Sequence, residues 1–335
     1  MRKIRVFDST LRDGSHANGH KFTEKQVQSY CDAIDPVGVE VLFVGHGNGL
    51  GASSAQIGFS KVDDIILLNT AIEHLSNTKL GAYLIPGFGT IRDNIIPAIK
   101  SGVKVFEIGC NCTEADISRE HIEYIRNKDL EVYGTLMMYH MSDTETIVEN
   151  AKKMESYGAN GVIIMDSAGA STKELVEKTF YELSQKLEIP IGFHAHNNLG
   201  MAVANTYTAI CNGATIIDGT MRGYGAGAGN CQLEAICGLL HNKNILDVDL
   251  LKLLNASESV MDQIMHISMG IDPISIISGL AGVFSAFKEH AINAGKFFMV
   301  DPKEILLEVG KRKAVGGQED IVIEVAKNLA DKKVN

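Results

Sequence analysis

The sequence lacks the long basic and long apolar runs that mark nucleic-acid-binding and membrane proteins. Acidic side chains outnumber basic ones in the 335 residues, and the net charge is −10, so binding to nucleic acid is not expected. No uncharged apolar stretch reaches the ~18 residues that a membrane span needs. The first residues turn polar too soon for a signal peptide. The chain is therefore expected to act away from membranes and nucleic acids.

Cysteine is scarce as well, with six residues spread through apolar segments. This spacing predicts reduced thiols, which are typical of the cytoplasm, rather than a disulfide framework. Cys110 and Cys112 lie close together, but no second pair stands at the spacing of a zinc site. What the sequence does contain is 45% hydrophobic residues, enough for a sizeable core at this length.

The apolar residues fall into eight short runs separated by segments of helical character. Each run has four to eight residues and is rich in Val, Ile or Phe, as buried parallel strands are. Capping boxes that start helices are predicted at Thr23, Ser142 and Ser171, because Gln or Glu follows each of them three residues later. The runs are Ile4–Phe7, Val39–Val44, Leu80–Ile85, Val103–Ile108, Glu131–Met138, Gly161–Met165, Pro190–Ala195 and Ala214–Gly219.

Every second run follows a glycine, which suits the left-handed residue that ends a helix before a strand. These glycines are Gly38, Gly102, Gly158 and Gly213. Eight strand-then-helix units with this alternation predict an α/β fold, a closed (β/α)8 TIM barrel. A doubly wound open sheet is the alternative. It would usually carry a glycine-rich phosphate loop after the first run, where this chain has Arg12 and Asp13.

The chain beyond the eighth run contains no clear strand. A helix is expected over Gln232–Leu240, and apolar residues recur at helical spacing in Leu250–Met265 and Ile321–Leu329. We therefore predict two domains. Residues 1–240 form a TIM-barrel catalytic domain, and residues 241–335 form a helical C-terminal extension that packs beside the barrel mouth or a partner.

Polar side chains gather where the predicted strands end, which is where TIM barrels place their active sites. Asp13 follows the first run, and His194 and His196 end the seventh. Two histidines two residues apart share one face of a strand, and imidazoles inside an apolar barrel are costly unless bound. With Asp13 they could hold Mn²⁺, Mg²⁺, Fe²⁺ or Zn²⁺. Two histidines satisfied by hydrogen bonds alone are the alternative.

Two further side chains stand beside this candidate metal site. Arg12 could stabilise an oxyanion or enolate as it forms, or it could only make a salt bridge to Asp13 or Asp8. His16 is predicted to be a general acid or base, the alternative being a solvated loop histidine. The glycine-rich segment 223–230 could cradle an anion or form a tight turn. Together these residues predict metal-assisted chemistry on a small, oxygen-rich molecule.

Five segments of the sequence together resemble a known enzyme family, the 4-hydroxy-2-oxovalerate aldolases. These class II pyruvate aldolases belong to the wider superfamily of HMG-CoA lyase and isopropylmalate synthase. The resemblance runs from about residue 3 to residue 330, and it implies a TIM barrel with a helical C-terminal domain. The segments that carry it are TLRDGSHA, LMMYHM, HAHNNLG, GAGAGN and VGGQED.

The resemblance also implies a cofactor, a set of residue roles and a partner. The cofactor would be Mn²⁺, with Mg²⁺ or another divalent cation as the substitute. In bacterial catabolic pathways such aldolases associate with an acylating acetaldehyde dehydrogenase and pass the aldehyde across, so an oligomer is expected. The implied roles are metal binding by Asp13, His194 and His196, enolate stabilisation by Arg12, proton abstraction by His16 and contact with the substrate carboxylate by Ser167.

Five positions depart from the pattern of that family. They are Phe284 for a tyrosine, Asn48 for an aspartate, Asn197 for a third histidine, Tyr139 for a serine and Arg222 for a small residue. These changes predict an altered pocket for the aldehyde half of the substrate, with Tyr139 and Arg222 in contact with it. For Arg222 the alternative is an ion pair with a neighbouring acid such as Asp218 or Glu234. The second substrate is then expected to be larger than acetaldehyde, or anionic.

The sequence as a whole predicts a divalent-metal-dependent aldolase. It would cleave or form a 4-hydroxy-2-oxo acid, such as 4-hydroxy-2-oxovalerate, with pyruvate and an aldehyde as the other partners. No lysine is well placed at the strand ends for a Schiff base, which agrees with a metal as the electron sink. One alternative is an acyl-CoA Claisen condensing or cleaving enzyme on the same barrel. The other is a non-catalytic assembly subunit, which Phe284 and Asn48 would favour.

Overall fold

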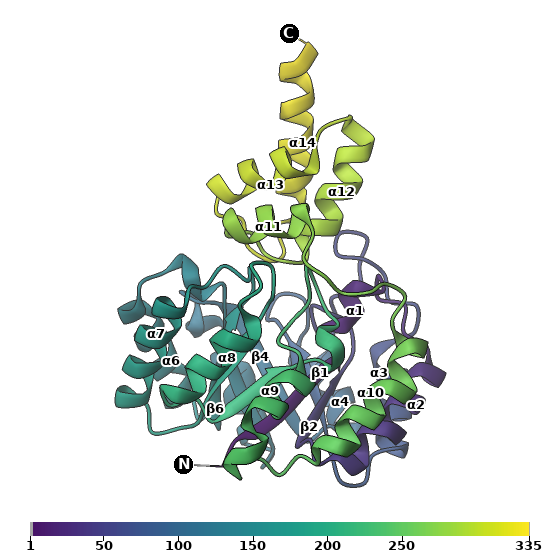
Figure 1. Ribbon diagram of the computed structural model, residues 1–335, viewed down its shortest axis with the longest axis vertical. Coiled ribbons are helices and arrows are strands. Elements are labelled where there is room, and N and C mark those ends of the chain that lie inside the picture. Colours follow the sequence, from purple (N-terminus) through teal and green to yellow (C-terminus); the bar gives the residue numbers. More distant parts are fainter. Residues whose placement is uncertain (1–2, 335) are drawn as a thin grey trace.

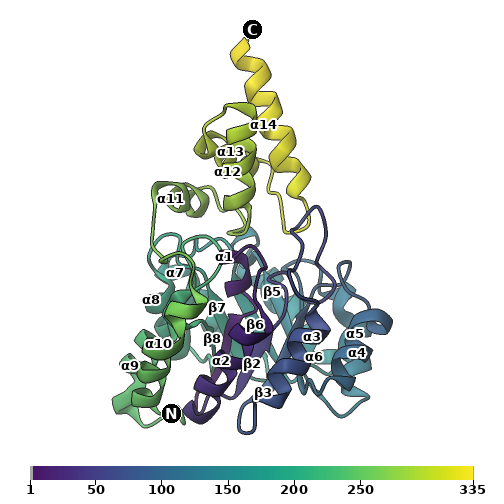
Figure 2. The same cartoon turned by 90° about the vertical axis from the view of Figure 1, so that its right-hand side faces the viewer.

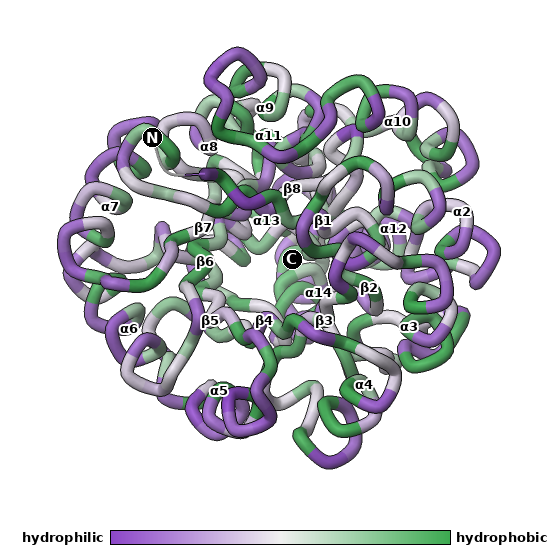
Figure 3. The backbone as a smooth tube through the Cα atoms, turned by 90° about the horizontal axis from the view of Figure 1, so that it is seen from below, coloured by the Kyte–Doolittle hydropathy of each residue, from purple (hydrophilic) through white to green (hydrophobic). Residues whose placement is uncertain are grey.

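The computed structural model, which describes residues 3–334, contains the predicted closed barrel. Eight parallel strands follow one another around it in chain order, and β1 closes the sheet by pairing with β8 (Figure 3). The doubly wound open sheet is therefore excluded. The strands are β1 (Arg5–Leu11), β2 (Val41–Val44), β3 (Lys79–Leu84), β4 (Val105–Asn111), β5 (Glu131–Met137), β6 (Gly161–Asp166), β7 (Ile191–Ala195) and β8 (Ile216–Gly219).

Helices surround the barrel and continue beyond its last strand. They are α1 (Gly14–Ala17), α2 (Glu24–Ile34), α3 (Asp64–Glu73), α4 (Ile96–Lys100), α5 (Arg119–Arg126), α6 (Thr144–Ser156), α7 (Lys173–Lys186), α8 (Ala202–Cys211), α9 (Leu233–Leu240), α10 (Leu250–Ile264), α11 (Pro273–Leu280), α12 (Phe287–Phe298), α13 (Pro302–Lys311) and α14 (Glu319–Val334). Shorter turns are η1 (Asp35–Val37), η2 (Ile91–Ile95), η3 (Ala115–Ser118), η4 (Tyr139–Met141), η5 (Met221–Gly223) and η6 (His241–Lys243). Within the described residues, no helix has the length and apolar character of a membrane span.

The glycines before the even-numbered strands behave as predicted. Gly38, Gly102, Gly158 and Gly213 have φ angles of 93°, 92°, 96° and 110°. Residues that carry a side chain rarely adopt this left-handed backbone conformation, because their Cβ would clash with the chain. The glycines therefore turn the chain from each preceding helical segment into the next strand.

The predicted helix starts are right at one helix and wrong by one residue at two. Thr23 accepts a hydrogen bond from the third amide of α2 and completes the capping box. At α6 the cap is Asp143 rather than Ser142, and at α7 it is Thr172 rather than Ser171. In both cases the residue with extended backbone next to the helix takes the amide hydrogen bond, because its side-chain oxygen reaches the first turn.

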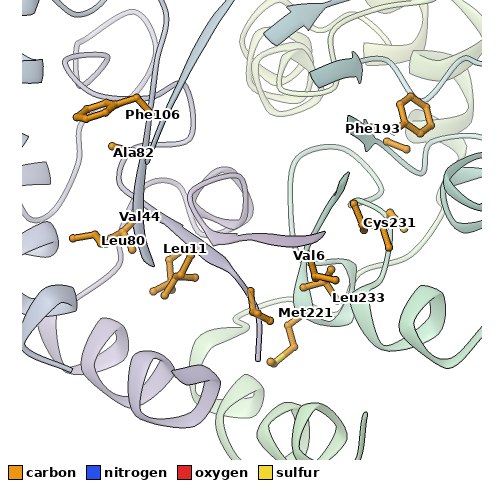
Figure 4. Close-up of a cluster of buried hydrophobic side chains, with 14 of the residues drawn as sticks. Val6, Leu11, Val44, Leu80, Ala82, Phe106, Phe193, Met221, Cys231 and Leu233 are labelled. Atoms are coloured by element: carbon orange, nitrogen blue, oxygen red, sulfur yellow. The ribbon is translucent and has the colours of Figure 1, made fainter. Parts of the chain in front are cut away.

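The barrel has an apolar interior and a wider apolar layer between strands and helices. Figure 4 shows part of the outer layer, including Val6, Leu80 and Phe106. At the N-terminal end of the strands, Arg5 and Lys79 form ion pairs with Glu131 and Glu40. The interior cluster consists of Phe7, Val41, Phe43, Val105, Tyr133, Ile163 and Ile216. The predicted metal ligands lie at the opposite, C-terminal end of the strands.

The helices α11 to α14 form a separate layer above that C-terminal end (Figures 1 and 2). Their buried residues pack in one cluster with Tyr83, Met137 and Met165 at the barrel mouth. The earlier helix α10 lies instead against α2 on the side of the barrel, where the Gln26 side chain donates to the carbonyl oxygen of Gln263 at 3.0 Å. The domain division at residue 240 stays a prediction.

Candidate active site

The structure brings Asp13, His194 and His196 together at the barrel mouth. One possible ligand atom from each residue lies within 4.8 Å of the other two, and all three residues are buried. His194 and His196 stand two residues apart, so both face inward from the same edge, with ring centroids 5.2 Å apart. Two imidazoles and one carboxylate at these separations match the donor set of a divalent transition metal or Mg²⁺.

The orientation of His194 supports a metal rather than a purely structural role. Its Nδ1 pairs with Asp218 Oδ2 at 2.7 Å, while the other oxygen of Asp218 accepts from the Ser9 hydroxyl at 2.7 Å. The buried Nε2 of His194 has no hydrogen-bond partner in the protein. A carboxylate that holds one ring nitrogen and leaves the other as a free acceptor is the arrangement found around metal-bound histidines. The residues present therefore fit a divalent cation.

The glycine-rich segment 223–230 binds the side chain of Asp13. The amide of Ala226 and the Asn230 side chain donate to Asp13 Oδ2 at 3.1 and 2.6 Å. A Cβ at Gly225 would lie 2.4 Å from that same oxygen, so only glycine allows this approach. Burial raises the pKa of Asp13, but the electrostatic effects of the neighbouring His196 and Arg12 outweigh it and hold the pKa well below its usual range. Asp13 is thus a fixed anion.

Arg12 makes the predicted salt bridge and also faces the site. Its Nη1 donates to Asp13 Oδ1 at 2.9 Å, and its Nη2 lies 3.9 Å from Asp218 Oδ2. The guanidinium carbon lies 4.7 Å from the centre of the Tyr83 ring, a cation–π contact. Burial lowers the pKa of Arg12, but Asp13 and Asp218 outweigh it and raise the pKa. A permanent positive charge is therefore aimed at the metal-binding cluster.

His16 lies at the border of two cavities. Its ring rests on the backbone of Gly47, and its centroid is 5.1 Å from that of His20. His20 in turn stacks on His46 at 3.7 Å. Burial lowers the pKa of His16 to about 3, with a partly opposing effect of Asp13. The ring is therefore neutral at neutral pH, which is the state that a general base requires.

The chamber above the metal cluster is small. Its volume is about 10 Å³, and Asn48 and Phe284, two of the positions that depart from the family pattern, contribute to its lining together with Arg12, Asp13 and His16. A cavity of about 750 Å³ adjoins it and shares His16 and Asn48. Because ~10 Å³ holds about one water, a small organic acid can enter only if groups such as Phe284 move.

Three predicted substrate residues lie outside that chamber. The Ser167 hydroxyl is buried at the end of β6 and accepts from the amide of Met138 at 3.1 Å. Tyr139 is fully buried with its ring edge against Phe193, on the helix-facing side of β7. Since Phe193 alternates with His194 along the strand, Tyr139 faces away from the barrel interior. The predicted substrate contact of Tyr139 is not supported by this placement.

Arg222 is also placed away from the chamber. Its side chain donates to Asp262 at 2.6 Å and to the hydroxyl and carbonyl oxygens of Ser257, all on α10. Its own amide is held by Glu234, in a left-handed backbone with φ 52°. This placement does not support the predicted contact of Arg222 with the aldehyde, because its guanidinium is bound to α10.

Sequence reasoning missed residues whose roles appear only in three dimensions. Asn230, the last residue of the glycine-rich segment, holds Asp13, and Gly47 provides the surface under His16. Asn198 is fully buried and binds Ala168 O and Ser285 Oγ, both at 2.9 Å, through its amide nitrogen. Gly47 precedes Asn48, and the segments HAHNNLG and GAGAGN contain Asn198 and Asn230, but only neighbouring residues suggested chemistry there.

Comparison with known proteins matches the barrel and the C-terminal helices to two separate families. Residues 3–260 match the HMGL-like family, and residues 269–331 match the DmpG-like communication domain. The chain is 45% identical over 335 residues to the 4-hydroxy-2-oxovalerate aldolase of Pectobacterium atrosepticum, covering 100% of this chain and 98% of that protein. It is 47% identical over 333 residues to the enzyme of the same name from Pelotomaculum thermopropionicum, covering 99% and 97%.

A solved structure with lower identity has the same fold. The carboxyl transferase domain of pyruvate carboxylase from Rhizobium etli superimposes with a TM-score of 0.83 at 14% identity. The match covers 99% of this chain and 61% of that one. At this identity the similarity shows the fold alone, that is, the barrel and the helices above it. The chemistry is argued from the residues.

Proposed function

Since the chain belongs to the family of 4-hydroxy-2-oxovalerate aldolases, we propose that it cleaves a 4-hydroxy-2-oxo acid into pyruvate and an aldehyde, or runs the reverse reaction, with a divalent metal. The protein is an aldolase, a carbon–carbon lyase. The observation that carries the proposal is the buried Asp13, His194 and His196 cluster with Arg12 and His16 at its edge. Mn²⁺ is the proposed ion, with Mg²⁺ as a substitute.

The protein's own residues divide the work of the cleavage. The chemistry that a divalent cation supplies when bound here is polarisation of a 2-oxo group as a Lewis acid. His16 takes the proton of the 4-hydroxyl group as the bond between C3 and C4 breaks. Arg12 stabilises the negative charge that develops on the pyruvate enolate, because its guanidinium is fixed and shielded from water. The protonated His16 then returns its proton to C3 of the enolate, which gives pyruvate.

Ser167 is retained in the proposal as a group near the substrate carboxylate. Its oxygen accepts one hydrogen bond from Met138, which leaves its hydroxyl hydrogen free to donate. Phe284 and Asn48 line the chamber, so we assign the altered preference for the aldehyde half to these two positions. Tyr139 and Arg222 take no part in it.

The test is a coupled assay with purified full-length protein. We expect pyruvate release from 4-hydroxy-2-oxovalerate with added Mn²⁺, detected as NADH loss through lactate dehydrogenase, and no release after exhaustive chelation. Asp13→Ala should abolish both metal retention and turnover. Arg222→Ala is the matched control, since it removes a charged residue near the barrel mouth that lies outside the chamber. Full activity of chelated protein, or cleavage of acyl-CoA substrates instead, would contradict the proposal.

We further propose that the C-terminal helices dock an acylating aldehyde dehydrogenase. Support comes from the match of residues 269–331 to a communication domain. It also comes from the exposed apolar side chains Leu280, Phe297 and Met299, which are 69%, 80% and 85% exposed. Size-exclusion chromatography of the two proteins mixed should give a joint peak. Replacement of Phe297 by Asp should weaken it, and separate elution of the wild-type proteins at micromolar concentration would refute it.

A further inference from the structure

A buried carboxyl group lies inside the barrel and has no role in the cleavage described above. It belongs to Glu107 in β4, whose side chain is fully buried. Val105, two residues earlier, packs in the interior cluster, so Glu107 projects into the barrel from the same face of the strand. Tyr83 is its register partner on β3, and the Tyr83 ring carries the guanidinium of Arg12. Glu107 therefore lies in the layer beneath the active site.

The hydrogen bonds inside the barrel favour a charge on Asp218 and not on Glu107. Asp218 accepts short hydrogen bonds from Ser9 and His194, both at 2.7 Å. Glu107 has one long contact, from the Thr135 hydroxyl at 3.4 Å, and its second oxygen has no partner. A buried carboxylate with so little compensation takes up a proton instead. Of the two carboxyl groups, Glu107 is the one that the surroundings leave neutral.

The charged and titratable groups around Glu107 together favour its neutral form. Burial and the negative charge of Asp218 raise the pKa of Glu107 well above its usual range, and the positive charge of Arg12 offsets this only in part. Burial also raises the pKa of Tyr83, whose hydroxyl lies 3.1 Å from the Met137 sulfur. Tyr83 thus adds no charge at neutral pH.

We propose that Glu107 is a positioning residue held as the neutral acid beneath Arg12, so that the loaded site keeps one positive charge for an anionic substrate. The inference rests on the proposed metal-dependent function. Arg12 and a divalent cation carry three positive charges, and Asp13 and Asp218 carry two negative ones. The remaining positive charge attracts the carboxylate of a 2-oxo acid. An ionised Glu107 would cancel it.

The protonation state can be read without any turnover. Infrared spectra of Mn²⁺-loaded, full-length protein are compared at neutral pH between the wild type and Glu107→Gln. We expect the carbonyl band of a protonated carboxylic acid in the wild type that is lost in this variant. Glu114→Gln is the matched control, since Glu114 is exposed just beyond the same strand, and it should keep the band. A wild-type spectrum without a band assignable to Glu107 overturns the proposal.

Metal and substrate binding give a second measurement of the protonation state of Glu107. At neutral pH the Mn²⁺ affinity of Glu107→Gln, measured by calorimetry, should stay within about threefold of wild type, whereas removal of a true negative charge would weaken it about tenfold or more. As the pH rises and Glu107 ionises, KM for the oxo acid should rise in the wild type and stay flat in the variant, with the same shape of the kcat profile in both. A tenfold weaker Mn²⁺ affinity, or equal KM profiles, overturns the proposal.

These measurements separate the two proposals. The infrared and calorimetric arms do not use the aldolase reaction, so an inactive protein with the expected band and Mn²⁺ affinity would contradict the proposed function and leave the state of Glu107 established. Glu107→Met is a second neutral variant of similar volume, and it repeats the calorimetric test if the amide variant folds poorly.

Discussion

Gly47 offers the sharpest test of where the base must lie. A Cβ at this position would be 2.5 Å from both Cδ2 and Nε2 of His16. In Gly47→Ala the ring has to move by about 1 Å to reach ordinary contact, because Arg12 and His20 hold the carbonyl and amide groups of Gly47. A displacement of ~1 Å in a catalytic group can lower the rate about 100-fold, or about 2.7 kcal/mol in activation free energy.

The measurements for this variant are kcat, Mn²⁺ affinity and thermal stability. We expect the loss in kcat alone, since the metal ligands lie on other segments and the backbone of Gly47 is not in the left-handed region. Gly238→Ala is the control. A Cβ there would meet nothing within 4 Å, so that variant should match the wild type. A Gly47→Ala enzyme with kcat within threefold of wild type would refute the assignment of His16 as a precisely placed base.

Three other substitutions test neighbouring parts of the site. Arg12→Lys keeps the charge but loses the planar fork, so kcat should fall about 100-fold or more with unchanged metal content; a change below threefold would leave Arg12 a structural salt bridge. Asp218→Asn should weaken Mn²⁺ binding by about 10- to 100-fold in calorimetry, because it removes the partner of His194; unchanged affinity would argue against a metal on that ring. Arg222→Ala should lower the free energy of unfolding by about 1–2 kcal/mol and leave aldehyde preference unchanged, whereas a lost preference for anionic aldehydes would return Arg222 to the substrate pocket.

The barrel could be predicted from the sequence because its signals are local. Apolar runs of strand length and the glycines before every second strand depend only on neighbouring residues, and both predictions are confirmed. Helix starts were harder, since Ser142 and Asp143 can each cap a helix and only the backbone decides between them. The helices α11 to α13 had no prediction of their own, because their apolar faces are matched to each other and to the barrel mouth.

The active site was predictable to the extent that strand parity determines it. His194 and His196 had to share a face, and Asp13 had to stand at the same end of the barrel. Tyr139 and Arg222 show the limit of that reasoning. Both follow strands directly, but the chain turns after β5 and β8 through the left-handed residues Met138 and Arg222. The left-handed turn at Met138 changes the side to which Tyr139 points, whereas Arg222 is itself the left-handed residue. No local pattern in the sequence indicates either turn.

The contacts of Asn198 have a consequence for the order in which the molecule is assembled. Its side chain joins the loop after β6, the glycine-rich segment and Ser285, and the contact with Ser285 spans 87 residues of sequence. Ser285 follows all eight barrel strands in the chain, so the strands are synthesised before this contact can form. The barrel can therefore close before its mouth is complete. A nascent chain would gain its catalytic end only when residues near 285 have left the ribosome, so that a truncated product holds a finished barrel without a finished active site.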